Sequence, residues 1–394
     1  MRHIILVFIS CGMTLMSYAQ NLKNIQHKIT SKYFQEQRII QMHLPKEYSK
    51  EERLPVIYVF DAQWDTYFNL TTSTIDYLIE IKKIPKSIIV GIHSENRQFE
   101  FTAKIVNDNW DMPHLGGARF LEKHLSEEVI PLLNRDYNTE NFRIGIGHSL
   151  GATFVLNSLI DSPSLFNAYI SISPNLQIDD EEITLKIQRN IQQVKKLNKF
   201  LYTTIGSEGN PDTMFLPYVK KLDTLMQANK SEVFNWNFSI LKELDHATTP
   251  IESIDRGLLE LAKKWKLSEI EKERISKSLN VVKEFNSFYI NLSKWTGYSV
   301  IPSKNDYYSF SGILEAKKNY YDAINIYKSA IEKFPSESRF YNCVAENMIK
   351  LENKKGAKTY LHLALKILKN ETFEYADDKT YFEKLYKKNL EKIN

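Results

Sequence analysis

Hydrophobic and polar positions follow two distinct patterns over the first two thirds of the chain. The stretches "LPVIYVF" at 54–60 and "KSIIVGI" at 86–92 are continuous apolar runs, which are typical of strands buried on both faces of a sheet. By contrast, "GARFLEKHLSEEVIPLLNRDY" at 117–137 repeats its leucine and valine positions at helical spacing, so that one face of a helix is apolar. The pattern therefore predicts buried strands separated by amphipathic helices.

The same alternation continues to about residue 253. Two strands with mixed polar and apolar residues are predicted near the start, and four more follow with helices between them; these six lie at 24–30, 36–44, 142–146, 168–173, 199–205 and 233–240. Strands that alternate with helices in this way form a mostly parallel sheet with helices on both faces. We therefore expect an α/β domain over residues 20–266.

The last part of the chain has helical periodicity and no strand pattern. A comparison at an offset of 34 matches residues of the same type: Tyr307 with Tyr341, Ala323 with Ala357, and Ala330 with Ala364. With Tyr327 and Pro335, these positions fit the tetratricopeptide repeat, although Ser311 and Ala345 replace its usual glycine. We expect an all-α tetratricopeptide-like domain at 303–394. A helical linker at 267–302 supports it, because two repeats are too few for a free-standing solenoid.

The first twenty residues, "MRHIILVFISCGMTLMSYAQ", have a basic start, an apolar stretch and then small residues. This order predicts a signal peptide at 1–19, cleaved after Ala19, and export to the periplasm or the medium. An uncleaved membrane anchor is the alternative, but the apolar run is shorter than the roughly 20 residues of a spanning helix. Since Cys11 lies in this segment, the mature chain keeps only Cys343 and forms no intrachain disulfide.

Composition limits the classes of function. A chain of 394 residues exceeds the roughly 250–300 at which single cores stop growing, so at least two domains are expected. The net charge of +4 is small for this length and gives no argument for a nucleic-acid partner.

A serine between two glycines stands in "FRIGIGHSLGATFVL" at 142–156. The pattern G-x-S-x-G after a strand predicts Ser149 as a nucleophile on a tight strand-to-helix turn, which needs small residues such as Gly147 and Gly151. A dinucleotide-binding turn is the rival interpretation. The spacing G-x-G-x-x-x-G, the preceding α/β units and the lack of an acidic residue ending a strand about 20 positions later argue against it.

A serine nucleophile needs a general base. Downstream of the serine the chain has two histidines, His246 and His362. His362 lies in the helical repeat region, where a surface role is expected. His246 follows a predicted strand and precedes a helix, as the last triad residue of an α/β-hydrolase does.

A carboxylate must hold that base in the correct tautomer. Glu208 follows the predicted strand at 199–205, at the edge of the sheet where catalytic groups gather, and is the expected acid. Asp212 in the same loop and Asp245 beside the histidine remain alternatives, and Asp245 is equally explained as a loop cap.

The oxyanion hole needs two backbone N–H groups. Leu150, which follows the serine, is expected to supply one. The loop "YVFDAQWD" is expected to supply the other from Ala62 or Gln63. The aromatic residues that follow, including Trp64, are candidates for a substrate pocket or for the core, and His148 is a further candidate for contact with substrate.

The whole run from 115 to 176, together with "VGIHSENRQFEFT" and "PVIYVFDAQWD", resembles the putative-esterase branch of the α/β-hydrolases. This branch includes siderophore esterases and S-formylglutathione hydrolase, with feruloyl esterases nearby. The resemblance covers roughly residues 25–265. It implies Ser149 as nucleophile, Glu208 as acid and His246 as base, and it implies that Arg97 touches substrate or holds its loop.

Two residues depart from the branch. Ala152 replaces the last glycine of G-H-S-L-G-G, where a methyl at a helix start has little effect. Ala62 replaces the glycine of a D-G pair; if that position needs positive φ, the methyl costs roughly 1 kcal/mol or more and the oxyanion hole is affected. The fusion to helical repeats resembles a known bacterial subgroup.

The combined expectation is an exported serine hydrolase that cleaves a siderophore-type or carbohydrate-linked ester through an acyl-enzyme, with no metal and no cofactor. A thioesterase or acyltransferase with the same residues is one alternative. A non-catalytic scaffold that binds a protein partner through the helical repeats is another.

Overall fold

The computed structural model describes residues 24–107, 109, 114–373 and 375–393. The expected signal peptide at 1–19 lies outside the described residues. Among the helices that are described, none has both the length and the apolar character needed to cross a membrane.

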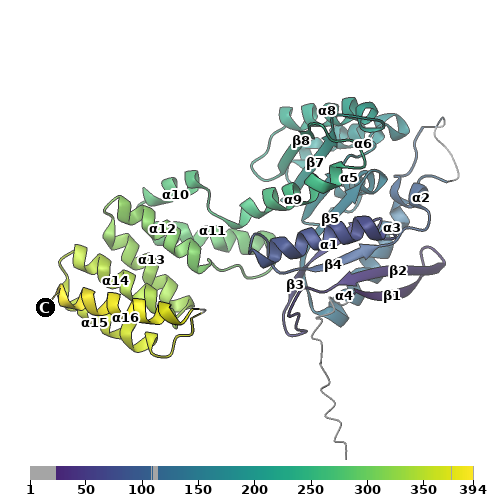
Figure 1. Ribbon diagram of the computed structural model, residues 1–394. Coiled ribbons are helices and arrows are strands. Elements are labelled where there is room, and N and C mark those ends of the chain that lie inside the picture. The colour runs from purple at the N-terminus through teal and green to yellow at the C-terminus, as the bar shows by residue number, and fades with distance from the viewer. Residues whose placement is uncertain (1–23, 108, 110–113, 374, 394) are drawn as a thin grey trace, which may run out of the picture.

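One eight-stranded sheet forms the centre of the first two thirds of the chain, as expected (Figure 1). Its strands are β1 (Asn24–Ser31), β2 (Glu36–His43), β3 (Leu54–Phe60), β4 (Ile88–Ile92), β5 (Thr139–His148), β6 (Ala168–Ile172), β7 (Phe200–Gly206) and β8 (Asn235–Leu241). The order is β1-β2-β4-β3-β5-β6-β7-β8. The hairpin of β1 and β2 is antiparallel, β2 is antiparallel to β4, and all later pairs are parallel. The carboxyl ends of β3 to β8 therefore meet at one edge.

Alternate residues of the central strands divide the hydrophobic core into two layers. Ile57 and Val59 of β3 belong to the layer covered by α1 (Asp65–Glu80) and α9 (Thr249–Ala262). Tyr58 and Phe60 of the same strand belong to the opposite layer, with residues of α5 (Leu150–Asp161). Both faces of β3 are buried, which explains why its sequence is a continuous apolar run.

Further helices in the described part of this region lie between consecutive strands along the chain. They are α2 (Arg97–Phe101), α3 (Ala118–His124), α4 (Ile130–Tyr137), α6 (Ile178–Arg189), α7 (Ile191–Val194) and α8 (Asp212–Ala228). The helical stretch expected at 117–137 consists of α3 and α4 joined by a π-helical turn at Leu125–Val129. This wider turn precedes Pro131. Proline has no backbone N–H to donate to the carbonyl four residues earlier, and its ring conflicts with that carbonyl, so the regular α-helical pattern is interrupted here.

Beyond residue 266, the described residues form seven α-helices, and these build an arm that extends away from the sheet (Figure 1). They are α10 (Glu269–Ser276), α11 (Val281–Thr296), α12 (Lys304–Ala316), α13 (Tyr320–Lys333), α14 (Ser338–Lys350), α15 (Lys354–Leu368) and α16 (Ala376–Glu391). The starts of α12 and α14 are 34 residues apart, and so are those of α13 and α15. All four alanines of the repeat are fully buried, so they permit close approach of neighbouring helices.

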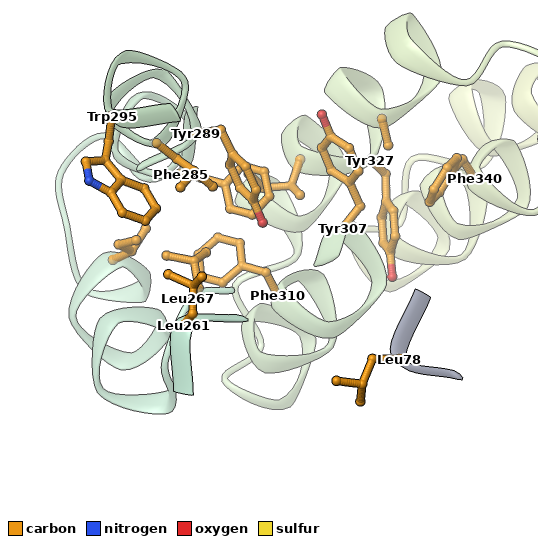
Figure 2. Packing of buried hydrophobic residues seen from close by; sticks show 14 of the residues in the cluster. Leu78, Leu261, Leu267, Phe285, Tyr289, Trp295, Tyr307, Phe310, Tyr327 and Phe340 are labelled. Atoms are coloured by element: carbon orange, nitrogen blue, oxygen red, sulfur yellow. The ribbon is translucent and has the colours of Figure 1, made fainter. Parts of the chain in front are cut away.

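The arm packs directly on the sheet region through aromatic side chains. The Trp295 indole N–H donates to the Asn198 carbonyl at 2.9 Å, and its ring lies 5.0 Å from that of Phe142 in β5. Beyond this contact, Leu261 and Leu267 face Phe310 of α12 (Figure 2). One continuous hydrophobic cluster therefore joins the sheet to the repeats.

Candidate active site

Ser149 forms a one-residue turn between β5 and α5. Its backbone has φ 58° and ψ −121°, a conformation that a residue with a side chain adopts only at a cost. The Ser149 N–H donates to the Ile172 carbonyl of the next strand at 2.9 Å. A serine held in this way at the end of a central strand has its hydroxyl exposed above the sheet, as a nucleophile requires.

Gly147 is needed because the strand and the helix approach closely at this position. A Cβ on Gly147 would lie 2.3 Å from the carbonyl carbon of Gly151, which is impossible without movement of the backbone. Ala152 is fully buried without such a conflict, and its carbonyl accepts a hydrogen bond from Ser171. The departure from the usual glycine at 152 is therefore accommodated.

His246 lies between β8 and α9, as the sequence predicted. Its Nδ1 is 2.6 Å from Oδ1 of Asp212. Because a carboxylate only accepts, Nδ1 carries the proton and Nε2 is left with a lone pair. This tautomer is the one that can remove a proton from a serine hydroxyl.

Asp212 is the first residue of α8, and its side chain is completely buried. Its second oxygen, Oδ2, accepts from the Ser173 hydroxyl at 2.8 Å and from the Gly206 N–H at 2.7 Å. Three hydrogen bonds therefore fix this carboxylate at the N-terminal end of α8. It is therefore held rigidly toward the histidine.

The expectation that Glu208 is the acid is wrong. Glu208 is exposed, and its backbone N–H donates to the Leu244 carbonyl, while Asp212 makes the contact with His246. Asp212, four residues beyond Glu208 and at the start of α8, reaches the histidine instead. Of the other candidates, Asp245 caps a turn by accepting from the Thr248 N–H at 2.9 Å.

The two other histidines considered in the sequence analysis are His148 and His362. His148 Nε2 lies 2.8 Å from the His246 carbonyl oxygen, and the two rings are 4.5 Å apart. Burial and the neighbouring His246 lower the pKa of His148 to about 3, so the ring is neutral and donates to that carbonyl. The structure thus shows His148 in contact with the His246 backbone, and contact of His148 with substrate stays a prediction. His362 is exposed on α15 in the arm.

The oxyanion-hole expectation needs one correction. The Ala62 N–H donates to the Ile92 carbonyl at 3.1 Å, so it is not available to a substrate. Gln63 therefore remains the expected donor from this loop, which stays a prediction. Leu150 is the first residue of α5, where N–H groups have no partner within the helix, and it fits its expected role.

Ala62 does not strain the loop. The residue with positive φ is Asp61, at 65°, and Ala62 is not among the residues with positive φ. The Ala62 methyl is buried against Gly91, where an added Cβ would lie only 2.5 Å away. The Ala62 methyl therefore needs a glycine at position 91 of the facing strand.

Arg97 holds its loop, which was one of its two expected roles. Its Nε and Nη2 donate to the two oxygens of Asp61 at 3.1 and 2.9 Å. The ring of Trp64 lies 4.7 Å from the guanidinium and is 45% exposed. Trp64 therefore lies at the rim of the site, where contact with substrate stays a prediction.

Sheet order, the strained serine after β5, the carboxylate after β7 and the histidine after β8 together define an α/β-hydrolase. The chain belongs to the esterase family described as "Putative esterase", whose model matches residues 31–242. The resemblance inferred from the sequence is thus confirmed.

Among curated proteins, the chain is similar to "Ferri-bacillibactin esterase BesA" of Bacillus subtilis (strain 168). They are 30% identical over 165 residues, which cover 37% of this chain and 56% of that protein. This chain therefore spans just over half the length of that relative. "Uncharacterized protein YjcH" of the same organism is 26% identical over 190 residues, covering 46% of this chain and 72% of that protein.

Among solved structures, an uncharacterised protein from Capnocytophaga ochracea DSM 7271 has a TM-score of 0.70 at 15% identity and covers 94% of this chain and 99% of that one. An IroE-like serine hydrolase from Shewanella oneidensis has a TM-score of 0.59 at 22% identity, over 75% of this chain and 95% of that one. At these identities the matches show the fold. The first of them spans both the sheet and the arm.

Proposed function

We propose that the protein hydrolyses a carboxylic ester with Ser149 as nucleophile, His246 as base and Asp212 as the acid that orients the base. The observation that carries the proposal is the 2.6 Å contact between His246 Nδ1 and the buried Asp212 carboxylate, beside a serine on a strained turn. Strained backbone persists at functional sites because the surrounding structure holds it there. Membership of the esterase family supports the same reaction.

The reaction begins when Ser149 Oγ attacks the ester carbonyl carbon and its proton passes to His246 Nε2. The N–H groups of Leu150 and Gln63 stabilise the negative charge on the former carbonyl oxygen. The tetrahedral intermediate collapses to an acyl-serine as His246 returns the proton to the departing alcohol. Water then attacks the acyl-serine by the same route, which releases the acid and restores Ser149.

Asp212 acts through the histidine. As His246 becomes positively charged, the adjacent carboxylate stabilises it. Because Ser173 and Gly206 already occupy the other oxygen, the carboxylate does not rotate away during the reaction. This preorganisation is expected to account for most of the contribution of Asp212 to the reaction rate.

We further propose a siderophore-type ester as the substrate. BesA is named as a ferri-bacillibactin esterase, and the neighbour from Shewanella oneidensis as an IroE-like serine hydrolase. A carbohydrate-linked ester and a thioester are the competing substrates. An acyltransferase differs from all of these because an added alcohol, in place of water, takes the acyl group.

Two further proposals concern location and partners. The N-terminal sequence supports export with cleavage after Ala19. Mass spectrometry of the N-terminal peptide, isolated from a cell extract and from the medium, tests this proposal.

The 34-residue helix spacing and the buried alanines support a tetratricopeptide-like arm that binds a protein partner.

A fluorophosphonate probe tests the reaction directly, since it forms a covalent adduct with an activated serine. The wild type is expected to label and to hydrolyse p-nitrophenyl acetate, and Ser149→Ala to do neither. Ser207→Ala, which changes a hydroxyl near the site that the reaction does not use, is the matched control. A folded wild type that neither labels nor turns over would contradict the proposal and favour the scaffold alternative.

A further inference from the structure

Asp61 carries a buried charge that takes no part in the proposed reaction. It directly follows β3, its side chain is fully buried, and its φ is 65°. A buried carboxylate is destabilising unless charged or polar partners satisfy it. The hydrogen-bond partners of Asp61 therefore indicate its role.

Two side chains donate to Asp61. Arg97 makes the two-pronged contact from α2, and the Gln63 amide donates to Oδ1 at 2.8 Å. The other end of that amide, Oε1, accepts from the Ser94 N–H after β4 at 3.0 Å. The Gln63 side chain is thus held at both ends.

The neighbouring peptide groups are fixed as well. The Ala62 N–H donates to Ile92, and the Trp64 N–H donates back to the Asp61 carbonyl at 3.1 Å. Among the described residues, the structure shows no acceptor for the Gln63 N–H between them. The Gln63 N–H is therefore the backbone donor of this turn that can bind an incoming oxygen.

The same carboxylate also lies against the serine turn. A Cβ on Gly151 would be 3.4 Å from Asp61 Oδ2, so the carboxylate sits beside the first turn of α5. Negative charge is favoured there by the helix N-terminus. Asp61 thus connects the loop of one proposed oxyanion donor, Gln63, with the helix that carries the other, Leu150.

We propose that the Asp61–Arg97 pair positions the oxyanion hole by setting the distance and direction between the Gln63 and Leu150 N–H groups. The inference rests on the proposed function. Asp61 and Arg97 are positioning residues and do not touch the reacting atoms. Arg97 does not serve as a free anion-binding site, because its Nε and Nη2 are engaged by Asp61 and its face by Trp64.

Arg97→Lys and Asp61→Asn test the proposal, since each keeps a polar side chain but loses the two-pronged contact. A displacement of about 1 Å at such a site costs on the order of 100-fold, so each variant is expected to lower kcat about 10- to 100-fold while KM for p-nitrophenyl acetate changes less than about twofold. The fluorophosphonate labelling rate falls in parallel. The double variant is expected to resemble the single variants, because both break one unit.

Arg135→Lys is the matched control. Arg135 also makes a two-pronged contact with an aspartate, Asp136, but on the exposed surface of α4. It is expected to leave kcat and KM unchanged. Gln63→Ala, which keeps the backbone donor and removes only its side-chain clamp, gives the same test if Asp61→Asn fails to fold.

Two results would overturn the inference. A rise in KM at unchanged kcat would make Arg97 a substrate contact, and wild-type values in Arg97→Lys and Gln63→Ala would make the pair merely structural. Failure of the proposed function is distinguishable, because the wild type itself would then not label, or Ser149→Ala would retain turnover.

Discussion

The carboxyl edge of the sheet and the helical arm use the same residue types in opposite ways. At the sheet edge, Gly147 permits a close backbone contact and Ser149 adopts a strained conformation. In the arm, Gly312 of α12 faces open space, and the helices begin with ordinary caps such as Asn319. The sheet edge therefore keeps a backbone conformation that destabilises the fold at the position where chemistry is expected. The helices of the arm have ordinary caps and show no comparable strain at these positions.

Of the variants that compare the sheet edge with the arm, Gly147→Ala is expected to have the largest effect. The added Cβ conflicts with the backbone of Gly151, so either the serine turn is displaced or the domain unfolds. We expect activity to fall at least about 100-fold, since a shift of about 1 Å at the reacting group has that effect. Circular dichroism melting and p-nitrophenyl acetate turnover measure the two consequences. Normal turnover would show that the turn is far more tolerant than its geometry indicates.

Phe310→Ala is expected to break the connection between the two regions. The Phe310 ring is fully buried and stacks on Phe285 with 5.1 Å between centroids. Loss of a buried phenylalanine costs about 3–5 kcal/mol, and the continuous cluster should transmit this loss to the sheet region. We expect one cooperative transition at a lower Tm, with kcat retained below it. Tyr381→Ala, at an exposed position of α16, is the control. Two separate transitions would contradict a shared core.

Two buried glutamates should give opposite pH dependence. Burial raises the pKa of Glu122 in α3 to about 7, although the Ser162 hydroxyl and the Asn157 amide donate to it. Its folded-state pKa exceeds its unfolded value of about 4.3, so stability is lost as pH rises from about 4.5 to 7. Glu122→Gln is expected to stabilise the protein by roughly 1–3 kcal/mol at pH 8 and hardly at pH 4.5.

Glu337 in the arm is the counterpart. Ion pairs with Arg339 and Lys304 overcome its burial and lower the pKa of Glu337. Its contribution is present above the unfolded pKa and is lost as pH falls through the lower folded pKa. Glu337→Gln should therefore destabilise the protein at pH 7 and less so in acid. Denaturant unfolding across pH measures both variants, and the same sign for both would refute the contrast.

Gly312→Ala is expected to have the smallest effect. Nothing lies within 4 Å of the added methyl, and alanine is favoured over glycine in a helix by about 0.5–1 kcal/mol. The variant should therefore be more stable, by a few degrees in Tm. A loss of stability would mean that α12 needs this glycine for a contact that the repeat pattern does not explain.

Much of the fold was predictable because it depends on repeated, local patterns. Continuous apolar runs marked the buried strands, and the offset between Tyr307 and Tyr341 matched the spacing of whole helices. Ser149 and His246 were predictable because each follows a strand in a fixed chain order.

The acid and the second oxyanion donor depended on loop geometry that the sequence does not express. Glu208 and Asp212 are both in the loop after β7 or directly beyond it, and only the path of the chain decides which reaches the histidine. Similarly, the positive φ falls on Asp61, one residue earlier than the glycine pattern indicated, so the Ala62 N–H turns back to the sheet. The position of Asp212 at the start of α8 is a feature of the structure, whereas the sequence pattern placed this residue in the same loop as Glu208.

The most direct test compares Asp212→Asn with Glu208→Gln by kcat/KM for p-nitrophenyl acetate. Asparagine at the acid position favours the wrong histidine tautomer, an effect of about 10,000-fold in a serine protease, so we expect a loss of roughly 1,000- to 10,000-fold. Glu208→Gln is expected to remain within about threefold of wild type, because surface substitutions have small effects. The reverse order, with Glu208→Gln inactive and Asp212→Asn active, would contradict the assignment of Asp212 as the residue that orients His246.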